Sequence, residues 1–545
     1  MSDNSQNVPN NAANDTSSTR SEDISLTVSP ELSPEQRARN ESAKRVILFT
    51  VFLDLLGFGI VIPLLGVYST QFGASPLTAG ILAATYSAMG FLFSPFWGRL
   101  SDRIGRRPVL LYSIFGTAVG YVIFAFAHFV PAFALSMLFL SRIVDGITSG
   151  NISTAQAYLS DITPPAERAK TFGIFGAIFG IGFAIGPSVG AAISLLPGAW
   201  GTNFGLGIIT AALAFTNWFL AWKRLPETLS PEIRAANLQK DASSTRSGAR
   251  RQIINVHGFR QAFRLPGLRL LITLSFFITA AFAMPLQGTY SLFLITKYAR
   301  PEVQERIKAD PQAAIDEARS EVGKPAPVDT TGSEGATVDH LAKNKSGDVA
   351  PYPRTMGGDF NLDKPSPPDL SWRHIEKLLV ARLASRQSSL IFAAIGLTAM
   401  LVQGGLIGPI RKWLGEVKMI IFGTLIMAFA LCLIPFPKSI YGELPIMALL
   451  AIGNSIATPV LTSLVTAFSP ENSRGELIGV FQSVQSLGRI IGPLAGGGLF
   501  NYFSPNAPYW AGAIVMALTF FIALQLRRVC PDDNCGEPKI ATAAA

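Results

Sequence analysis

Four ionisable side chains interrupt long apolar runs of the sequence: Asp54, Arg142, Asp145 and Arg489. A charge at the centre of a bilayer costs about 2.5–3.5 kcal/mol on insertion scales, so each group must face a cavity or find a partner. Asp145 lies one helical turn from Arg142, and the two can therefore pair on one helix face. A carboxylate so placed can bind and release protons, and a neighbouring arginine favours its deprotonated form.

We therefore expect Asp54, Arg142 and Asp145 to form a proton-coupling site. The competing interpretation is a pair of buried ion bridges that only hold helices together. The residues lie at different depths along their helices, so sequence positions alone do not assemble them into a cluster.

Several other chemistries lack their motifs in this sequence. It has no Walker A phosphate loop, so ATP is not the expected energy source, and it has neither His-Glu-x-x-His nor Gly-x-Ser-x-Gly. The 4 His are unclustered and the 3 Cys are too few for a disulfide scaffold. We expect no metal, no cofactor and no enzymatic activity. The net charge of +9 lies in loops beside apolar runs, which membrane topology explains without nucleic-acid binding.

The composition is that of a polytopic membrane protein. Of 545 residues, 49% are apolar and 15% charged, and the mean hydropathy is +0.35, whereas about 25% of a typical soluble domain is charged. The runs long enough to cross about 30 Å of hydrocarbon as helices are 46–66, 78–97, 109–127, 132–156, 172–196, 203–222, 268–295, 388–410, 417–436, 444–468, 475–499 and 508–526. The alternation of a β-barrel is absent, so the predicted fold is all-α with twelve transmembrane helices.

Charge in the short loops predicts the orientation. Loops after the second and eighth spans carry Arg99, Arg103, Arg106, Arg107, Arg411, Lys412 and Lys418. The turns after spans 1, 3, 5 and 11 contain neither Lys nor Arg. Because basic loops stay on the cytosolic side, even-numbered loops and both termini are expected to be cytosolic.

The spans divide the chain into two halves with polar segments around them. We expect a disordered cytosolic tail at 1–45, a six-helix bundle at 46–222, a cytosolic linker at 223–267, a second bundle at 268–526 and a cytosolic tail at 527–545. Within the second bundle, a polar insertion at 297–386 is expected on the non-cytosolic side, where its sequon makes Asn344 a glycosylation candidate. Apolar spacing from Trp372 to Leu383 predicts an interfacial helix before the eighth span.

The two halves repeat one another. At an offset of 306 residues, the matched pairs are Pro164 with Pro470, Arg168 with Arg474, Gly173 with Gly479, Phe175 with Phe481, Gly182 with Gly488, Gly186 with Gly492, Pro187 with Pro493 and Gly190 with Gly496. Further frames pair Gly98 and Gly105 with Gly408 and Gly415, and Pro63 and Tyr68 with Pro285 and Tyr290. Two parallel repeats imply alternating access, with substrate held near the midplane between the halves.

Local motifs carry a resemblance to a known family. Gly98-Arg-Leu-Ser-Asp-Arg-Ile-Gly-Arg-Arg-Pro108 resembles the loop 2–3 signature of the major facilitator superfamily. Leu53-Asp54-x-x-Gly57-x-Gly59-x-x-x-Pro63 resembles the first-helix motif of its tetracycline-resistance-like drug:proton antiporters, and Gly182-x-x-x-Gly186-Pro187-x-x-Gly190 resembles their antiporter motif, although Ala191 replaces a Gly usual there. The resemblance implies that the loop locks the cytosolic side in the outward-facing state.

Physical arguments give each motif a second interpretation. Gly98 and Gly105 bracket Asp102, which can pair with Arg103 or Arg106, so we expect a latch in this turn; the alternative is arginines that only fix orientation. The glycine stripe of the antiporter motif allows close helix packing, and Pro187 bends its helix. That stripe is expected to be structural rather than to contact substrate.

Polar residues within the spans are candidates for a substrate cavity, although a helix–helix hydrogen bond explains each of them alone. The candidates are Tyr86, Gln156, Gln287, Tyr290, Asn454, Gln482, Gln485 and Arg489. We expect a monomeric, proton-coupled exporter of small amphipathic compounds in the plasma membrane or an internal membrane. Two alternatives remain: proton-linked or facilitated uptake of a nutrient such as a sugar, and a membrane sensor or scaffold that does not transport.

Overall fold

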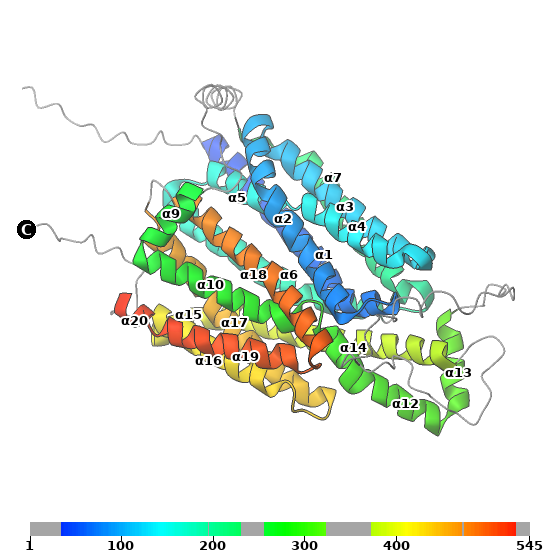
Figure 1. The fold of residues 1–545 in the computed structure, drawn as a ribbon. Coiled ribbons are helices and arrows are strands. Elements are labelled where there is room, and N and C mark those ends of the chain that lie inside the picture. The colour runs from blue at the N-terminus through cyan, green and yellow to red at the C-terminus, as the bar shows by residue number, and fades with distance from the viewer. Residues whose placement is uncertain (1–33, 195, 230–255, 323–371, 471–473, 530–545) are drawn as a thin grey trace, which may run out of the picture.

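All regular elements in the described part of the chain are helical. The computed structural model describes residues 34–194, 196–229, 256–322, 372–470 and 474–529. Its helices form two groups, one above the other in Figure 1. The N-terminal half contains α1 (Pro34–Gln71), α2 (Pro76–Ile104), α3 (Arg106–Phe126), η1 (Ala127–Phe129), η2 (Pro131–Phe133), α4 (Ala134–Ile147), α5 (Asn151–Ile162), α6 (Pro165–Ser194), η3 (Gly198–Gly201) and α7 (Asn203–Arg224).

The C-terminal half begins with a short helix, α9. Its elements are α9 (Val256–Arg264), α10 (Pro266–Leu286), α11 (Tyr290–Leu294), the π-helix η4 (Ile295–Ala299), α12 (Arg300–Ala309), α13 (Pro311–Val322), α14 (Trp372–Leu401), the π-helix η5 (Val402–Leu406), α15 (Ile407–Leu414), α16 (Glu416–Leu433), α17 (Ile440–Phe468), α18 (Arg474–Tyr502), α19 (Ala507–Ala523) and α20 (Leu526–Val529).

The helices are long enough for the predicted membrane crossings. Within the described residues, 10 helical stretches are long and apolar enough to cross a membrane. Two further helices, α6 with 30 residues and α18 with 29, occupy the fifth and eleventh predicted spans. The prediction of an all-α fold with twelve crossings in two bundles is confirmed.

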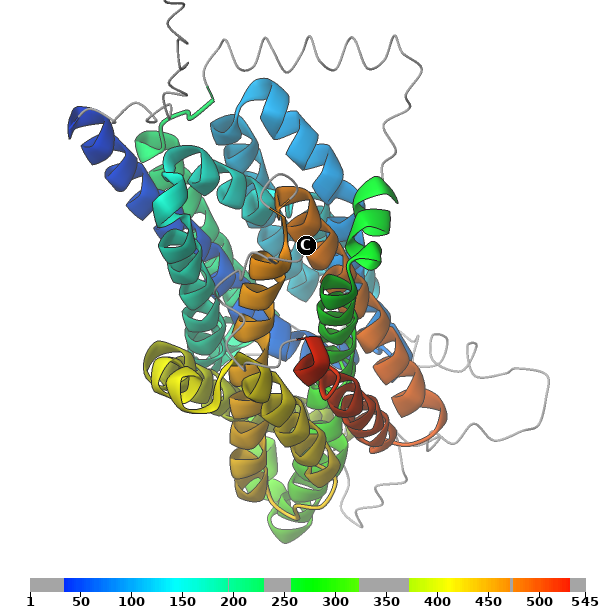
Figure 2. The same ribbon diagram turned by 90° about the vertical axis from the view of Figure 1, so that its left-hand side faces the viewer.

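The halves are related by corresponding helix contacts. In the N-terminal half α6 packs on α1, and in the C-terminal half α18 packs on α10. The cross-half contact of α18 with α2 likewise corresponds to that of α6 with α14, and α3–α7 corresponds to α16–α19. Figure 1 shows α6 and α18 between the two groups of helices, and Figure 2 shows the same fold turned by 90°. The duplication predicted from matched glycines is therefore a duplication of packing.

The two halves approach closely at one end of the molecule. We call the end with the α2–α3 turn the basic end, and the end with α12 and α13 the insertion end. At the insertion end, a Cβ added to Gly80 of α2 would lie 3.1 Å from Cα of Gly497 of α18, and one added to Gly66 of α1 would lie 3.0 Å from the oxygen of Gly288. The halves thus approach closely at the insertion end.

Several helix boundaries differ from the expected ones. Helix α1 begins at Pro34, inside the segment expected to be a disordered tail. The fourth span consists of two helices, because a turn at 148–150 separates α4 from α5. At that turn, a Cβ on Gly150 would lie only 2.5 Å from Cγ of Trp97, so glycine permits this close approach to α2.

The polar segment 297–386 begins and ends as helix. The seventh span breaks at 287–289, where Gly288 has a φ of 94°, and then continues through η4 into α12. The segment beginning at Trp372 is continuous with the eighth span as α14, rather than a separate interfacial helix. An apolar cluster that includes Val303, Ile315 and Leu379 joins α12, α13 and α14, which explains why helix extends past the apolar runs. Asn344 lies outside the described residues.

Candidate functional site

A buried ion pair lies within the N-terminal half. Arg142 Nη1 lies 3.2 Å from Asp145 Oδ2, and both residues of α4 are buried. Arg142 also donates from Nη2 to Ser141 Oγ at 3.2 Å, and its guanidinium lies 5.7 Å from the ring centre of Tyr121. Gly120 of α3 lets α4 approach, since an added Cβ would lie 3.2 Å from Cβ of Asp145. The predicted pairing of Arg142 with Asp145 is present in the structure.

Asp54 has a partner that the sequence analysis did not identify. Asn151 Nδ2 donates a hydrogen bond to Asp54 Oδ2 at 2.5 Å. Asn151 is the first residue of α5, so the turn between α4 and α5 places its side chain toward α1. Asp54 is only half-buried, whereas Asn151 is buried. The hydrogen bond from Asn151 therefore ties the carboxylate of Asp54 to the start of α5.

The four intramembrane charges lie within electrostatic range of Tyr86 on α2. Its side chain interacts electrostatically with Asp145, Asp54, Arg142 and Arg489, and Asp54 interacts with Asp145 in the same way. Arg489 comes from α18 of the other half, where its Nη2 donates to Ser486 Oγ at 2.9 Å. The packing of the helices brings these side chains near one another, although they lie at different depths along their own helices. The resulting site lies between the two halves.

The remaining cavity candidates divide into two groups. Gln482 of α18 donates from Nε2 to Gln156 Oε1 of α5 at 3.0 Å, which is a direct hydrogen bond between the halves. Gln485 is half-buried on the same helix as Gln482. In contrast, Asn454 accepts a bond from Thr458 on its own helix, and Tyr290 is buried against aromatic rings including Phe293.

Tyr290 and Asn454 thus make local contacts within the C-terminal half, and neither has a described contact with the charged site. Gln287 caps the end of α10 and is half-buried at the break in that span. The contacts that the structure gives these three residues fit a packing role.

The glycine stripe makes the same contact in each half. On α6, a Cβ at Gly186 would lie 2.7 Å from Cα of Gly59 on α1, and at Gly182 it would lie 2.7 Å from Cβ of Leu55. On α18, a Cβ at Gly492 would lie 2.7 Å from the oxygen of Ala280 on α10. Gly190 similarly faces Ile60, and Pro187 lies within α6. These residues bring the backbones of α6 and α1, and of α18 and α10, into close contact within each half.

The basic turn is held together by charge within the N-terminal half. Arg106 Nη1 donates to Asp102 Oδ1 at 2.5 Å and to Ser101 Oγ at 2.7 Å, and its Nε donates to Asp161 of α5 at 3.1 Å. Gly105 has a φ of 111° and links α2 directly to α3. The equivalent Gly415 has a φ of 75° and links α15 to α16, so the repeat extends to this turn.

Two other residues of the turn lie at its surface. Arg103 is exposed, and Gly98 has open space around it. The described ion pair of Asp102 is with Arg106, which also pairs with Asp161 of α5.

Glu227 is a member of this turn that the sequence analysis did not select. It follows α7, and its two carboxylate oxygens accept the backbone N–H groups of Arg106 at 3.0 Å and Arg107 at 3.2 Å. These N–H groups open helix α3 and have no partners within the helix, and a carboxylate there also complements the helix dipole. Sequence spacing gives no signal for this contact, because 120 or more positions separate the partners.

Removal of this cap gives a testable expectation. Glu227→Ala should lower the free energy of unfolding by about 1–2 kcal/mol, because the first turn of α3 loses a charged acceptor. Thermal unfolding of the purified full-length protein would measure the change. Glu305→Ala removes an exposed carboxylate from α12 and serves as the matched control. Equal melting temperatures for the two variants would contradict a capping role.

Comparison with known proteins identifies the family. The family model described as Major Facilitator Superfamily matches residues 47–300 and 352–537. The chain belongs to the Major Facilitator Superfamily. As a member of this superfamily it is a multi-pass membrane protein of a transporter family, and the resemblance inferred from its motifs is confirmed.

The superfamily relatives include drug-resistance proteins. Tetracycline resistance protein, class C, of Escherichia coli is 27% identical over 496 residues, which is 90% of this chain and 97% of that protein. The class H protein of Pasteurella multocida is 38% identical over 142 residues, so the match spans only 26% of this chain and 34% of that relative. A crystal structure of a D-xylose-proton symporter has a TM-score of 0.56 at 14% identity and covers 88% of this chain and 96% of that one. This structural likeness concerns the fold alone.

Proposed function

We propose that this protein is a proton-coupled exporter that moves small amphipathic or drug-like compounds out of the cytosol by alternating access. The observation that carries the proposal is that Asp54, the Arg142–Asp145 pair and, from the other half, Arg489 all lie within electrostatic range of Tyr86. Carboxylates in that position can exchange protons with whichever side the halves open toward. The full-length similarity to a tetracycline resistance protein supports the drug-like class of substrate.

The proton would act through the groups that contact Asp54 and Asp145. When the site opens to the acidic, non-cytosolic side, Asp54 takes up a proton. Its carboxyl group then lacks the negative charge that strengthens the hydrogen bond from Asn151. When it opens to the cytosol, the proton leaves, and Asn151 and Arg142 stabilise the two carboxylates in their ionised form. Substrate binds to the ionised site on the cytosolic side and leaves when the site is protonated on the other.

The orientation follows from the basic end. The arginines of the α2–α3 turn support a cytosolic placement of that end, together with both termini. The close approach of the halves at the insertion end then corresponds to the state that is closed on the non-cytosolic side. Residence in the plasma membrane or an internal membrane, and a monomeric state, complete this proposal.

Uptake is the second candidate function. The fold is shared with a structure titled as a D-xylose-proton symporter, and the same carboxylates would serve symport. A sensor or scaffold function would instead use the segment between α12 and α14. Direction of proton flow separates antiport from symport, and deletion of 323–371 separates both from a loop-based receptor.

Transport in everted membrane vesicles tests the proposal. With the cytosolic face outward and the vesicle interior acidic, we expect members of a panel that includes a tetracycline and a quinolone to accumulate inside. Accumulation should alkalinise the lumen and should vanish when a proton ionophore collapses the gradient. Accumulation only when the gradient is reversed would favour symport, and transport unaffected by the ionophore would contradict proton coupling.

A further inference from the structure

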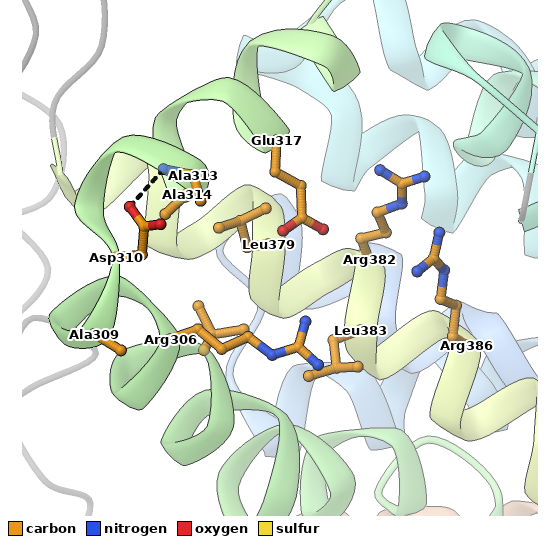
Figure 3. Close-up of a pocket in the computed structure, with 11 residues that line it drawn as sticks. Arg306, Ala309, Asp310, Ala313, Ala314, Glu317, Leu379, Arg382, Leu383 and Arg386 are labelled. Carbon is orange, nitrogen blue, oxygen red and sulfur yellow. Dashed lines mark hydrogen bonds between the residues drawn. The ribbon is translucent and has the colours of Figure 1, made fainter.

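A cavity lined by three arginines lies at the insertion end, away from the proton site. It has a volume of about 280 Å³ and lies among α12, α13 and α14. Its charged lining residues, seen in Figure 3, are Arg306, Asp310, Glu317, Arg382 and Arg386. Three arginines and two carboxylates line the cavity, and a third carboxylate, Glu302, pairs with Arg306 beside it.

The carboxylates of this cavity already have roles. Asp310 Oδ1 accepts the backbone N–H of Ala313 at 3.0 Å and so caps the start of α13. Glu317 interacts electrostatically with Arg382, which also faces Arg386. Arg382 and Arg386 are four residues apart on α14, a spacing at which like charges repel. An anion between the helices would offset this repulsion.

The arginines come from two helices and border an apolar wall. Arg306 belongs to α12, and it also pairs with Glu302 at 2.5 Å. In Figure 3 its guanidinium extends toward Leu383, and Leu379 lies between the helices. Val303 and Ala314 are also among the apolar lining residues, and both are buried. A ligand here would meet guanidinium groups on one side and hydrocarbon on the other.

The cavity begins at the boundary of the membrane. Arg386 lies two residues before the apolar run 388–410, and Arg306 lies eleven residues after the run 268–295, or about 16 Å beyond it as a helix. This interval contains the headgroup layer of a bilayer whose hydrocarbon core is about 30 Å thick. Arg306 and Arg386 are exposed, so a headgroup can reach them.

We propose that this cavity binds an amphipathic oxyanion, a phosphate or carboxylate carried on an apolar body, and that the headgroup of an anionic phospholipid supplies it. The planar fork of arginine matches the two oxygens of a phosphate or carboxylate, which a single ammonium group does not. The apolar wall at Leu379 and Leu383 receives the first carbons of the chain. Because α12, α13 and α14 all line the cavity, the bound anion stabilises the insertion end.

Binding can be measured on the full-length protein without any transport assay. Thermal unfolding in detergent is followed while phosphatidic acid or phosphatidylcholine is added. We expect phosphatidic acid to raise the melting temperature saturably and phosphatidylcholine to leave it unchanged. In the double variant R382Q/R386Q the apparent affinity for phosphatidic acid should fall about tenfold or more, since the anion loses two charge-assisted partners.

A matched variant separates a built site from diffuse attraction. K308Q/R319Q removes the same charge from exposed positions of α12 and α13 that do not line the cavity, and it should respond like the unmodified protein. Equal effects of the two lipids, or equal losses in the two double variants, would overturn the proposal. Both variants must elute as the unmodified protein does on gel filtration, which shows that folding is retained.

Two soluble probes identify the source of the anion. Dodecyl phosphate below its micelle concentration and inorganic phosphate are added in place of lipid. Protection by phosphatidic acid but not by dodecyl phosphate assigns the cavity to membrane lipid. Saturable protection by dodecyl phosphate assigns it to a free amphiphile, and protection by inorganic phosphate alone would overturn the requirement for an apolar body.

Discussion

Asp54→Asn is expected to abolish substrate accumulation driven by a proton gradient, by about a hundredfold or more, while exchange of substrate between the two sides continues. Exchange requires the halves to alternate but requires no net change in protonation. Asparagine keeps the shape of the side chain and can still bond with Asn151, whose amide contacts Asp54 at 2.5 Å. The variant removes only the titratable group, so the loss should be confined to coupling.

Reconstituted vesicles distinguish the two activities in one preparation. Accumulation is measured with an imposed pH gradient, and exchange is measured without a gradient using labelled substrate on one side. Asp54→Glu should retain part of the accumulation because it retains a carboxyl group. Asp316→Asn removes an exposed carboxylate from α13 and serves as the control. Full accumulation by Asp54→Asn would show that Asp54 does not carry the coupled proton.

Arg142→Gln is expected to cause the largest loss of stability in the N-terminal half. Asp145 lies 3.2 Å from Arg142 and both are buried, so the variant leaves a carboxylate without its cationic partner. Breaking a buried pair by removing one member costs about 3–5 kcal/mol, less whatever is recovered when the carboxylate takes up a proton. The contact of the guanidinium with the ring of Tyr121 is lost as well.

Removing both charges should be less harmful than removing one. The double variant Arg142→Gln/Asp145→Asn leaves no uncompensated charge and should regain much of the lost melting temperature, yet it should remain inactive in accumulation. Thermal unfolding of the purified variants measures this, with Arg269→Gln as the control for an exposed arginine at the start of α10. A double variant as unstable as Arg142→Gln would contradict a stability role for the pair, and an active one would contradict its role in coupling.

Much of the fold could be predicted because the signals behind it are repetitive. Apolar runs specify crossings, since only a helix satisfies the backbone in lipid without neighbours. The matched glycines predicted duplication because close packing of helices needs small residues at fixed positions, and Gly186 and Gly492 do contact α1 and α10 in the same way. Helix ends were less predictable. Helix α12 continues on polar sequence because buried residues such as Val303 and Ile307 pack against α13 and α14.

The site was predicted in part. The Arg142–Asp145 pair could be recognised from its spacing on one helix, but the partner of Asp54 could not, because Asn151 lies 97 positions away in the sequence. Asn151 and Glu227 are polar residues with no distinctive spacing, and only the folded chain places them beside Asp54 and the start of α3. Conversely, Tyr290 was selected as a polar residue in an apolar run, although its ring packs against Phe293.

Distances between spin labels on the two halves test alternating access most directly. With Cys432, Cys530 and Cys535 replaced, one pair of labels is placed at the exposed positions Lys223 and Trp413 near the basic end, and another at Phe129 and Phe503 near the insertion end. As the pH or the substrate concentration changes, we predict opposite shifts: the basic-end pair approaches while the insertion-end pair separates. If both label-to-label distances stayed fixed, or if both changed in the same direction, two halves rocking around a central site would be contradicted.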